Sequence, residues 1–422
     1  MIPQVLATVG GGGTRLYPLT LNLPKPLVEI CDTAVIAVLF RLLAVQGCRR
    51  FILGSKGAVN TLELCNYFKA GEGFFKRLGI NDPSGISYQP QYDDKGSADS
   101  LQYCLNYFNI NSDILVVSGD HLIDIDLKKL ICFHQRHKPV LTVVVKEMQP
   151  SENLSQYGVA NIDKNFRMTH FVEKPKNGTE LSRTINTAFY LFSHEIREVL
   201  HGMGDAARDI GGDLIPFLVE NGYKVCAYPV TGYWIGMGTP ERLHQATMDV
   251  LSGRINNFAF RHEYRANQWV HPSTLSKIQK HLDSGDIELK GNVSIGRNCR
   301  IEKGTVIENS HIGHTNMIER DTEIRKSTVM SFCNIKREVI INGSIVGRHS
   351  TIGTNSILDG DQPPSDGRIP VIGEDVTMPA ESVISPGTRV APIRYSTRIL
   401  SSGRFIELEF DDKNIYFAER VR

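Results

Sequence analysis

Up to about residue 253 the chain alternates between apolar runs of strand length and amphipathic stretches of helix length. The strand-like runs are VLATV, RFILGS, DILVVSGD, VLTVVV and KVCAYPV, and the helix-like stretches include AVIAVLFRLLAVQG and EIREVLHGM. This alternation predicts an α/β layer fold with a mostly parallel sheet. In such sheets ligands bind beyond the carboxyl ends of the strands, which is where the unusual residues of this chain occur.

From Val293 onward a repeat of 17 residues replaces this alternation. The same apolar position recurs in three columns, all Ile, Val or Leu: Ile295, Ile312, Val329 and Val346; Ile301, Ile318, Ile335 and Ile352; Ile307, Ile324, Ile341 and Leu358. Within each coil the steps are six, six and five residues, whereas an amphipathic helix needs steps of three and four. A three-sided coil needs one inward aliphatic residue per side, so the repeat predicts a left-handed parallel β-helix of the hexapeptide type.

The repeat is interrupted once and then resumes. Residues 359–370 break the period and are interpreted as an excursion loop, after which Ile372, Met378, Ile384 and Val390 restore the six-residue step. The tail segments RFIELEF and IYFAERV are expected to be closing strands. The predicted organisation is therefore an α/β domain over 1–254, a linker over 255–290 that docks on its neighbours, and the β-helix over 291–422.

The composition is that of an ordinary globular protein, with 41% hydrophobic and 22% charged residues and a formal net charge of +1. A near-neutral balance favours neither nucleic acid nor an anionic membrane as partner, so any phosphate binding must come from local groups. We expect no signal peptide and no membrane span. The eight cysteines are scattered without a C-x-x-C pair and are expected to be buried free thiols, which points to the cytoplasm.

The first chemical motif, GGGGTRLYPLT at residues 10–20, directly follows the first strand. Its Gly10, Gly11, Gly12 and Gly13 let backbone N–H groups approach phosphates, and the motif lacks the lysine of a Walker P-loop. Arg15 can neutralise phosphate charge, and Lys25, held between two prolines, suits a phosphate clamp.

Together these residues closely resemble the signature of the nucleotide-sugar pyrophosphorylases, G-x-G-T-R-L-x-P-L-T followed by P-K-P. Further similar segments follow in the family's order: GSADSL (96–101), VVSGDHL (116–122), YGVANID (157–163), FVEKP (171–175), INTAFYLF (185–192) and GYWIGMGTPERL (232–243). The resemblance covers essentially the whole chain. It implies a Rossmann-like nucleotidyltransferase domain followed by the β-helix, and an enzyme that forms an NDP-sugar and pyrophosphate from an NTP and a hexose 1-phosphate.

The resemblance also implies site residues. Catalytic roles fall to Arg15, Lys25 and Asp120, and Asp120 is the expected ligand of Mg²⁺. Nucleotide binding is expected from Gly10, Gly11, Gly12, Gly13, Thr14, Gln91 and Gly96, and sugar-phosphate binding from Gly158, Glu173, Lys174 and Asn186. Since neighbours in a strand point to opposite sides, the chain must turn at Glu173 and Lys174 for both to serve one site.

The substrate pair stays open at this point. Gln91 is the residue expected to read a pyrimidine edge, which favours glucose 1-phosphate with UTP or dTTP, and mannose 1-phosphate with GTP is the other pair. SGDH and GSADS are also similar to the ADP-glucose pyrophosphorylases, whereas PKPLVEI is unlike their sequence.

One position departs from the family pattern. Gly236 stands where the family has its second metal-binding aspartate, and glycine offers no ligand. Either Asp120, phosphates and water hold the metal, or another carboxylate such as Asp209 or Asp213 reaches it, or the chain has become a regulatory homologue. Because the other site residues are retained, we expect an active enzyme.

The β-helix raises a further hypothesis, since such helices often carry histidine-based acyltransferase sites. His311, His314 and His349 lie in the repeat and are more simply interpreted as exposed face or corner residues. The expected role of the β-helix is association into a homo-oligomer, because repeat stacks offer flat, extended faces.

Overall fold

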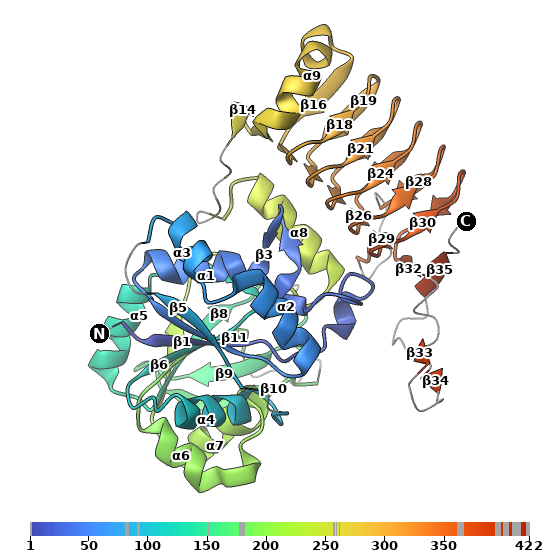
Figure 1. Ribbon diagram of the computed structural model, residues 1–422. Helices are drawn as coiled ribbons and strands as arrows, with labels where there is room; N and C mark the ends of the chain where they lie inside the picture. The colour runs from blue at the N-terminus through green and yellow to red at the C-terminus, as the bar shows by residue number, and fades with distance from the viewer. Residues whose placement is uncertain are drawn as a thin grey trace. The chain divides into compact units, whose positions relative to one another are not determined.

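The computed structural model describes residues 2–80, 84–90, 93–150, 152–176, 182–255, 258, 260, 262–360 and 367–392, and the strand residues 398–399, 405–406 and 415–418 (Figure 1). Its internal contacts divide the chain into two compact units. The first unit consists of Met1–Gly12 and Val35–Gly236, and the second unit consists of Gly13–Ala34 and Met237–Arg422. The division runs through the glycine-rich motif, so Arg15 and Lys25 belong to the second unit.

The first unit is built on a mixed sheet in the order β10-β9-β11-β6-β1-β4-β5, with β8 beside β11 and β12 beside β8. Its strands are β1 (Gln4–Thr8), β4 (Arg50–Gly54), β5 (Gly85–Tyr88), β6 (Ile114–Ser118), β8 (Leu141–Glu147), β9 (Gly158–Ile162), β10 (Met168–Glu173), β11 (Thr184–Phe192) and β12 (Val225–Pro229). The run β5-β4-β1-β6 is parallel, as the alternating pattern predicts, and so is β8-β12. The strand β11 is antiparallel to β6, β8 and β9.

Helices cover both faces of this sheet (Figure 1). They are α1 (Val35–Val45), α2 (Ala58–Phe68), α3 (Glu72–Arg77), α4 (Ser97–Tyr107), α5 (Leu127–His137), α6 (Ile196–Met203) and α7 (Ile215–Glu220), with the short turns η3 (Gly204–Ala206) and η4 (Ile210–Leu214). Phe51 of β4 packs with its ring centre 4.6 Å from Phe40 of α1 and 5.6 Å from Phe75 of α3. Its neighbour Ile52 points the other way and shares a buried cluster with Leu101 of α4. Alternate residues of one strand therefore serve two apolar layers.

A two-stranded sheet adds β7 (His121–Ile123) and β13 (Trp234–Gly236), which are antiparallel. This small sheet joins the segment after Asp120 to the GYWIGMG motif.

The second unit contains the predicted parallel β-helix. Its three sheets are β14-β15-β17-β20-β23-β26-β29-β32-β35, β16-β19-β22-β25-β28-β31 and β18-β21-β24-β27-β30. Their strands are β14 (Glu263–Arg265), β15 (Gln268–Val270), β16 (Ile287–Lys290), β17 (Val293–Ile295), β18 (Arg300–Ile301), β19 (Thr305–Glu308), β20 (His311–Ile312), β21 (Met317–Ile318), β22 (Glu323–Arg325), β23 (Thr328–Val329), β24 (Asn334–Ile335), β25 (Ile340–Asn342), β26 (Ile345–Val346), β27 (Thr351–Ile352), β28 (Ile357–Asp359), β29 (Val371–Ile372), β30 (Thr377–Met378), β31 (Val383–Ile384), β32 (Arg389–Pro392) and β35 (Ile415–Ala418). The short strands β33 (Arg398–Ile399) and β34 (Phe405–Ile406) pair with each other.

The register of the coils confirms the repeat. Ile307 pairs with Ile324, Ile324 with Ile341, and Ile341 with Leu358, and all four are fully buried. The period resumes after the interruption, where Leu358 pairs with Ile384. Stacked aliphatic columns thus form the core of the β-helix, and each coil buries its residues against the next.

The described residues of 255–290, predicted as a linker that docks on its neighbours, form regular elements. They include α9 (Pro272–Ser284) and the strands β15 and β16, which pair with β17 and β19 of the first regular coils. Ile278 of α9 is 1% exposed and belongs to the β-helix core. The 17-residue period is absent from this part of the sequence because the helix α9, with its 3.6-residue period, replaces one side of the coil.

The segment Gly13–Ala34 packs with the second unit. It forms the 3-10 helices η1 (Thr14–Leu16) and η2 (Lys25–Leu27) and the hairpin β2 (Glu29–Ile30)–β3 (Thr33–Ala34), and α8 (Pro240–Leu251) lies in the same unit. The contacts thus group these residues, which the sequence places in the α/β domain, with the β-helix.

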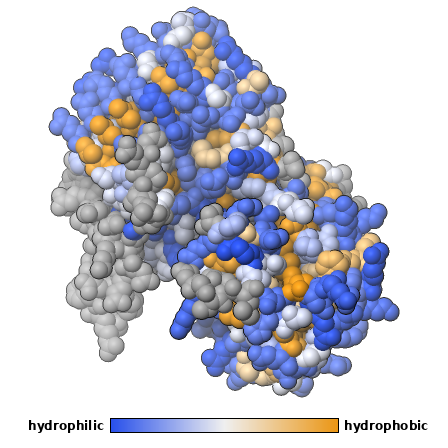
Figure 2. Space-filling view, turned by 180° about the vertical axis from the view of Figure 1, so that it is seen from behind, coloured by the Kyte–Doolittle hydropathy of each residue, from blue (hydrophilic) through white to orange (hydrophobic). Residues whose placement is uncertain are grey.

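All eight cysteines are free, and Cys31, Cys48, Cys104, Cys226, Cys299 and Cys333 are buried while Cys132 is exposed. Within the described ranges no helix has both the length and the apolar content to span a bilayer. On the face shown in Figure 2, hydrophobic residues gather in separate patches among hydrophilic ones.

Candidate functional site

In the first unit the glycine-rich motif and Asp120 follow neighbouring strand ends. The parallel strands β1 and β6 pair in register, with Thr8 opposite Ser118. Gly10, Gly11 and Gly12 come just after β1, and Gly119 N–H donates to the Thr8 carbonyl at 3.2 Å, which holds the turn leading to Asp120 beside them. The structure brings these predicted residues together at the carboxyl edge of the sheet.

Lys56 also lies at this edge, and the sequence reasoning missed it. A Cβ at Gly10 would lie 3.1 Å from the Lys56 Cβ, and Lys56 Nζ donates to the Asp94 carbonyl at 2.6 Å. The available signal was a cation placed directly after the strand-like run RFILGS.

An imidazole lies beside Asp120 where the family pattern has a second carboxylate. The Asp120 side chain accepts a hydrogen bond from Ser118 Oγ and is 12% exposed. Gly236 of β13 lies opposite His121 of β7, and a Cβ at Gly236 would lie only 2.5 Å from the His121 ring. His121 Nε2 is 3.8 Å from Asp120 Oδ1. The volume that an aspartate at position 236 needs is therefore filled by His121.

Asp209 and Asp213, the alternative carboxylates, are engaged in hydrogen bonds of their own. Asp209 accepts hydrogen bonds from Ser97 Oγ and from Gly212 N–H, both at 2.8 Å, and Asp213 accepts from Asp209 N–H at 2.7 Å. Across the part of the chain that the structure describes, no group of three or more His, Cys, Asp or Glu side chains is arranged to hold a metal. The hypothesis that Asp209 or Asp213 joins Asp120 at the metal stays a prediction, and both carboxylates already accept hydrogen bonds within their own loop.

The GSAD segment is tied to the Asp209 loop. A Cβ at Gly96 would lie 2.5 Å from the Arg208 carbonyl, and Ala98 N–H donates to that carbonyl at 2.9 Å. Gly96 therefore has a packing reason to be glycine, and its role in nucleotide binding remains a prediction.

Gln91, expected to read the base, lies outside the described residues. Gln89 is described and is 2% exposed. Its Oε1 accepts from Ser100 Oγ at 2.6 Å, and its Nε2 donates to Asp94 at 3.3 Å. Both ends of Gln89 thus serve contacts inside the protein.

The chain turns at Glu173 and Lys174 as the sequence requires. The strand β10 ends at Glu173, and Lys174 has a left-handed backbone with φ of 48°. Lys174 Nζ lies 3.6 Å from Glu173 Oε1, so both side chains point to the same place.

The Glu173 carboxylate sits in a cradle of glycines. Cβ atoms at Gly158 and Gly211 would lie 2.6 and 2.8 Å from Glu173 Oε2, so only glycine leaves room for the carboxylate. Burial raises the pKa of Glu173, the Lys174 charge lowers it and Asp209 raises it further. Gly158 and Glu173, which were predicted separately, therefore lie in contact: Glu173 is the acceptor, and Gly158 leaves room for its carboxylate.

A bulge in β11 adds Asn186 and Tyr190 to this cluster. The pairing of β11 with β8 shifts between these two residues, and Asn186 Nδ2 donates to the Tyr190 hydroxyl at 2.7 Å. Burial raises the pKa of Tyr190, and the charges of Asp209 and Glu173 raise it further. Tyr190 and Asp209 are members of this cluster that the sequence analysis did not assign to sugar-phosphate binding.

In the second unit, Gly13, Thr20 and Lys25 form one compact loop. Gly13 has a left-handed backbone with φ of 66°, and its carbonyl accepts from Thr20 Oγ1 at 2.8 Å. A Cβ at Gly13 would lie 3.3 Å from the Lys25 Cβ, while Arg15 reaches the start of α8 beside Gly238. The loop thus presents Thr14, Arg15 and Lys25 from one short segment.

This loop rests on charged residues of the β-helix. Arg389 Nη1 donates to the Tyr17 carbonyl at 3.2 Å, and Arg348 Nη1 lies 3.8 Å from Glu29 of the following hairpin. Glu374 holds Arg348 through a 2.7 Å contact to Nε. The β-helix therefore supports the segment that carries the two predicted cations.

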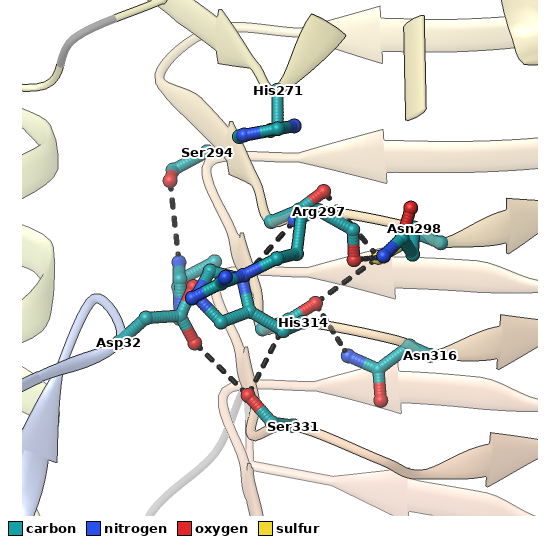
Figure 3. A network of polar contacts seen from close by, with 12 residues as sticks. Asp32, His271, Ser294, Arg297, Asn298, His314, Asn316 and Ser331 are labelled. Atoms are coloured by element: carbon teal, nitrogen blue, oxygen red, sulfur yellow. Dashed lines mark hydrogen bonds and ion pairs between the residues drawn. The ribbon is translucent and has the colours of Figure 1, made fainter. Parts of the chain in front are cut away.

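The hairpin turn at Asp32 docks on two histidines of the β-helix (Figure 3). Asp32 lies 3.5 Å from His311 Nε2 and 3.3 Å from His314 Nδ1, and Ser331 Oγ donates to it at 3.1 Å. His311 is 2% exposed, which corrects the expectation of an exposed residue, because a hairpin distant in sequence covers it. His349 is a corner residue, as expected, and stacks on Phe332.

Comparison with known proteins covers both parts of the chain. The family model described as "Nucleotidyl transferase" matches residues 5–253, and the one described as "GMPPB C-terminal domain" matches residues 289–400. A UTP–glucose-1-phosphate uridylyltransferase of Synechocystis sp. is 28% identical over 360 residues, or 84% of this chain and 90% of the relative. A glucose-1-phosphate adenylyltransferase of Bacillus cereus is 27% identical over 372 residues, or 83% of this chain and 92% of the relative.

Among solved structures, a glucose-1-phosphate thymidylyltransferase from Bacillus anthracis aligns with a TM-score of 0.49 and 21% identity. The alignment covers 58% of this chain and 93% of that protein.

Proposed function

Because the chain belongs to the nucleotidyl transferase family, we propose that it is a sugar-1-phosphate nucleotidylyltransferase. The observation that carries the proposal is the set of Glu173, Lys174 and Asn186, which offers a half-buried acceptor, an exposed cation and an amide. A carboxylate beside an ammonium group suits a ligand that has both hydroxyls and a phosphate.

In the proposed reaction an oxygen of the sugar phosphate attacks the α-phosphorus of the NTP. A new P–O bond forms, the bond between the α-phosphorus and the bridging oxygen breaks, and pyrophosphate leaves with that electron pair. Such a reaction needs positioning and charge neutralisation more than covalent help from the protein. We assign triphosphate neutralisation to Arg15 and Lys25, hydroxyl binding to Glu173 and phosphate binding to Lys174.

Nucleotidyltransferases of this family use a divalent metal. The residues present fit such an ion in part: Asp120 offers a carboxylate oriented by Ser118, and Gly236 offers nothing. We propose Mg²⁺ as the physiological ion and Asp120 as its carboxylate ligand. When bound, the ion neutralises phosphate charge, and Asp120 fixes its place.

The proposed substrates are a hexose 1-phosphate and an NTP. Glucose 1-phosphate is favoured because both named relatives are glucose-1-phosphate nucleotidylyltransferases. UTP or dTTP is the first candidate for the nucleotide, and mannose 1-phosphate with GTP is the second pair.

A substrate panel tests this function. The pure protein is incubated with Mg²⁺, each NTP and each of several sugar 1-phosphates, and released pyrophosphate is measured. We expect release with one pair and its loss in Lys174→Ala. Absence of release with every pair contradicts the catalytic function.

Gly236 favours one alternative, a regulatory homologue that binds substrates without turning them over. This alternative predicts a ligand-induced rise in unfolding temperature with no pyrophosphate release in the same panel. For the acyltransferase hypothesis, by contrast, His311 and His314 are already engaged by Asp32.

We also propose that the protein is a cytoplasmic homo-oligomer associated through the β-helix. The eight free thiols fit a reducing compartment. Ile340, Ile357 and Val383 follow one another in register along one sheet and are 38%, 37% and 69% exposed. An aliphatic stripe on a flat sheet is suited to pairing with a second copy.

A further inference from the structure

We infer that His121 supplies a second protein ligand for the divalent metal, beside Asp120, in place of the carboxylate that Gly236 lacks. The inference rests on the proposed nucleotidyl transfer and identifies a residue that the family pattern does not assign to the metal.

The pairing of β7 with β13 places His121 directly beside Gly236, so the two positions compete for the same side-chain space. The two residues are directly opposite, and a Cβ at position 236 would lie 2.5 Å from His121 Cδ2 and 2.6 Å from Nε2. An aspartate at position 236 and this histidine conformation therefore exclude each other. The position that lacks the carboxylate of the family pattern is thus the one whose side-chain space the His121 imidazole occupies.

The His121 ring is oriented as a ligand would be. Its Nε2 is turned to Asp120 Oδ1 at 3.8 Å, and the two side chains are 19% and 12% exposed. Trp234 packs with its ring centre 5.5 Å from the imidazole and limits its rotation. Adjacent ligands of a six-coordinate ion are about 3 Å apart, so a shift of under about 1 Å brings both atoms into one coordination shell.

A nitrogen ligand changes which metals the site prefers. Mg²⁺ binds oxygen ligands by preference, whereas imidazole suits later first-row ions such as Co²⁺. The Asp120–His121 pair is thus expected to bind Co²⁺ more tightly than Mg²⁺, with Mg²⁺ depending mainly on Asp120.

Metal titration of the full-length protein tests the inference without relying on turnover. Co²⁺ and Mg²⁺ are titrated by calorimetry, and Co²⁺ also by visible absorption, into wild type, His121→Ala and the control His201→Ala, which removes an exposed histidine of α6. We expect His121→Ala to weaken Co²⁺ binding at least about tenfold and Mg²⁺ binding by less than about threefold. Co²⁺ affinity in His121→Ala within about threefold of wild type overturns the inference.

A double variant protects the test against misfolding. In His121→Ala/Gly236→Asp the ring is gone and a second carboxylate can fit, so Mg²⁺ affinity is expected to rise above that of His121→Ala while the preference for Co²⁺ falls. Gly236→Asp alone is expected to lower the unfolding temperature, because the imidazole still fills the space. A double variant that prefers Co²⁺ as strongly as wild type does contradicts the assignment of His121.

The outcomes for this inference and for the proposed function are separable. Co²⁺ binding that depends on His121, without pyrophosphate release from any substrate pair, contradicts the function and supports the ligand. Turnover together with unchanged metal affinity in His121→Ala contradicts the ligand and supports the function.

Discussion

At the residue scale, the structure explains single side chains whose roles the motifs only imply. Glu173 is costly to keep charged, because burial raises its pKa while only Lys174 lowers it. The glycines at positions 158 and 211 leave space for its carboxylate but provide no side-chain donors. A half-buried acceptor whose charged form is disfavoured in this way is typical of a ligand-binding group.

Replacing Glu173 by Gln is therefore expected to raise stability and lower activity. Because the folded-state pKa is raised, the protonated carboxyl stabilises the fold below its ordinary pKa near 4.5, and this contribution is lost as pH rises through the folded value. At pH 7 Gln removes the cost of the buried charge, a gain on the order of 1 kcal/mol that shrinks at pH 4. The sugar-phosphate kcat/KM is expected to fall about 10–100-fold.

Thermal unfolding at both pH values and steady-state kinetics measure these changes, with the exposed Glu220→Gln as control. A Glu173→Gln variant that is less stable than wild type at pH 7 would show that the charge of Glu173 does not destabilise the folded protein.

Ala188 is a second residue under constraint. It has φ of 56° in the bulge of β11. A left-handed backbone at alanine destabilises the folded state by about 1–2 kcal/mol. Glycine removes this strain, but its greater freedom in the unfolded chain offsets about 0.5–1 kcal/mol of the gain. Ala188→Gly is therefore expected to stabilise the protein by about 0.5–1 kcal/mol in urea unfolding. Ala160→Gly, in the extended strand β9, is the control and should destabilise the protein. If both variants are less stable than wild type, Ala188 carries no backbone strain.

At the element scale, the hairpin β2–β3 links the cationic loop to the β-helix. Its turn places Asp32 against His311 and His314, and the preceding strand places Glu29 against Arg348. Burial alone would raise the pKa of Asp32, but the two histidines and Ser331 together hold it below its ordinary value. The hairpin turn is thus held by polar contacts with the β-helix in addition to apolar packing.

Asp32→Asn is expected to loosen this attachment and lower stability at pH 7 by about 1–3 kcal/mol. Since the folded-state pKa of Asp32 is depressed, its contribution is present above the ordinary pKa of 3.8 and is lost as pH falls through the folded value. The difference between variant and wild type should therefore shrink below pH 4. The KM for the NTP is expected to rise about 3–10-fold, because the loop carrying Arg15 and Lys25 is less well positioned.

Thermal unfolding between pH 3 and 7 and initial-rate kinetics test this, with Asp321→Asn at an exposed β-helix corner as matched control. Equal effects of both variants would mean that docking on the histidines contributes nothing.

At the scale of the whole molecule, the units defined by contacts do not follow the motifs. The chain passes from the first unit to the second between Gly12 and Gly13, returns at Val35, and passes again after Gly236. Both crossings into the second unit lie inside motifs that carry the family resemblance. The β-helix thereby supports part of the chemistry as well as offering a surface for association.

Association through the stripe Ile340–Ile357–Val383 is tested by light scattering coupled to size-exclusion chromatography. Wild type is expected to run as an oligomer, and Ile357→Glu as a smaller species, because a charge in an apolar interface costs several kcal/mol, of the order of 3 or more. Met317→Glu changes a similarly exposed residue, 40% accessible, on another sheet and should leave the oligomer intact. A monomeric wild type, or dissociation by Met317→Glu alone, contradicts this interface.

The sequence by itself determined what depends on periodicity and on local backbone chemistry. The 17-residue columns predicted the β-helix because stacked coils repeat one inward position, and the neighbouring Glu173 and Lys174 predicted a turn because strand neighbours diverge. The glycine motif and Asp120 could be placed together because parallel strands end at one edge.

The tertiary structure alone decided what depends on contacts between distant segments. Only the pairing of β7 with β13 shows that His121 fills the space of the aspartate missing at position 236. Only the docked hairpin makes His311 a buried partner of Asp32, and only the sheet pairing shows that β15 and β16 join the β-helix sheets. These features involve residues many positions apart, and no local pattern encodes which of them meet when apolar surface is buried.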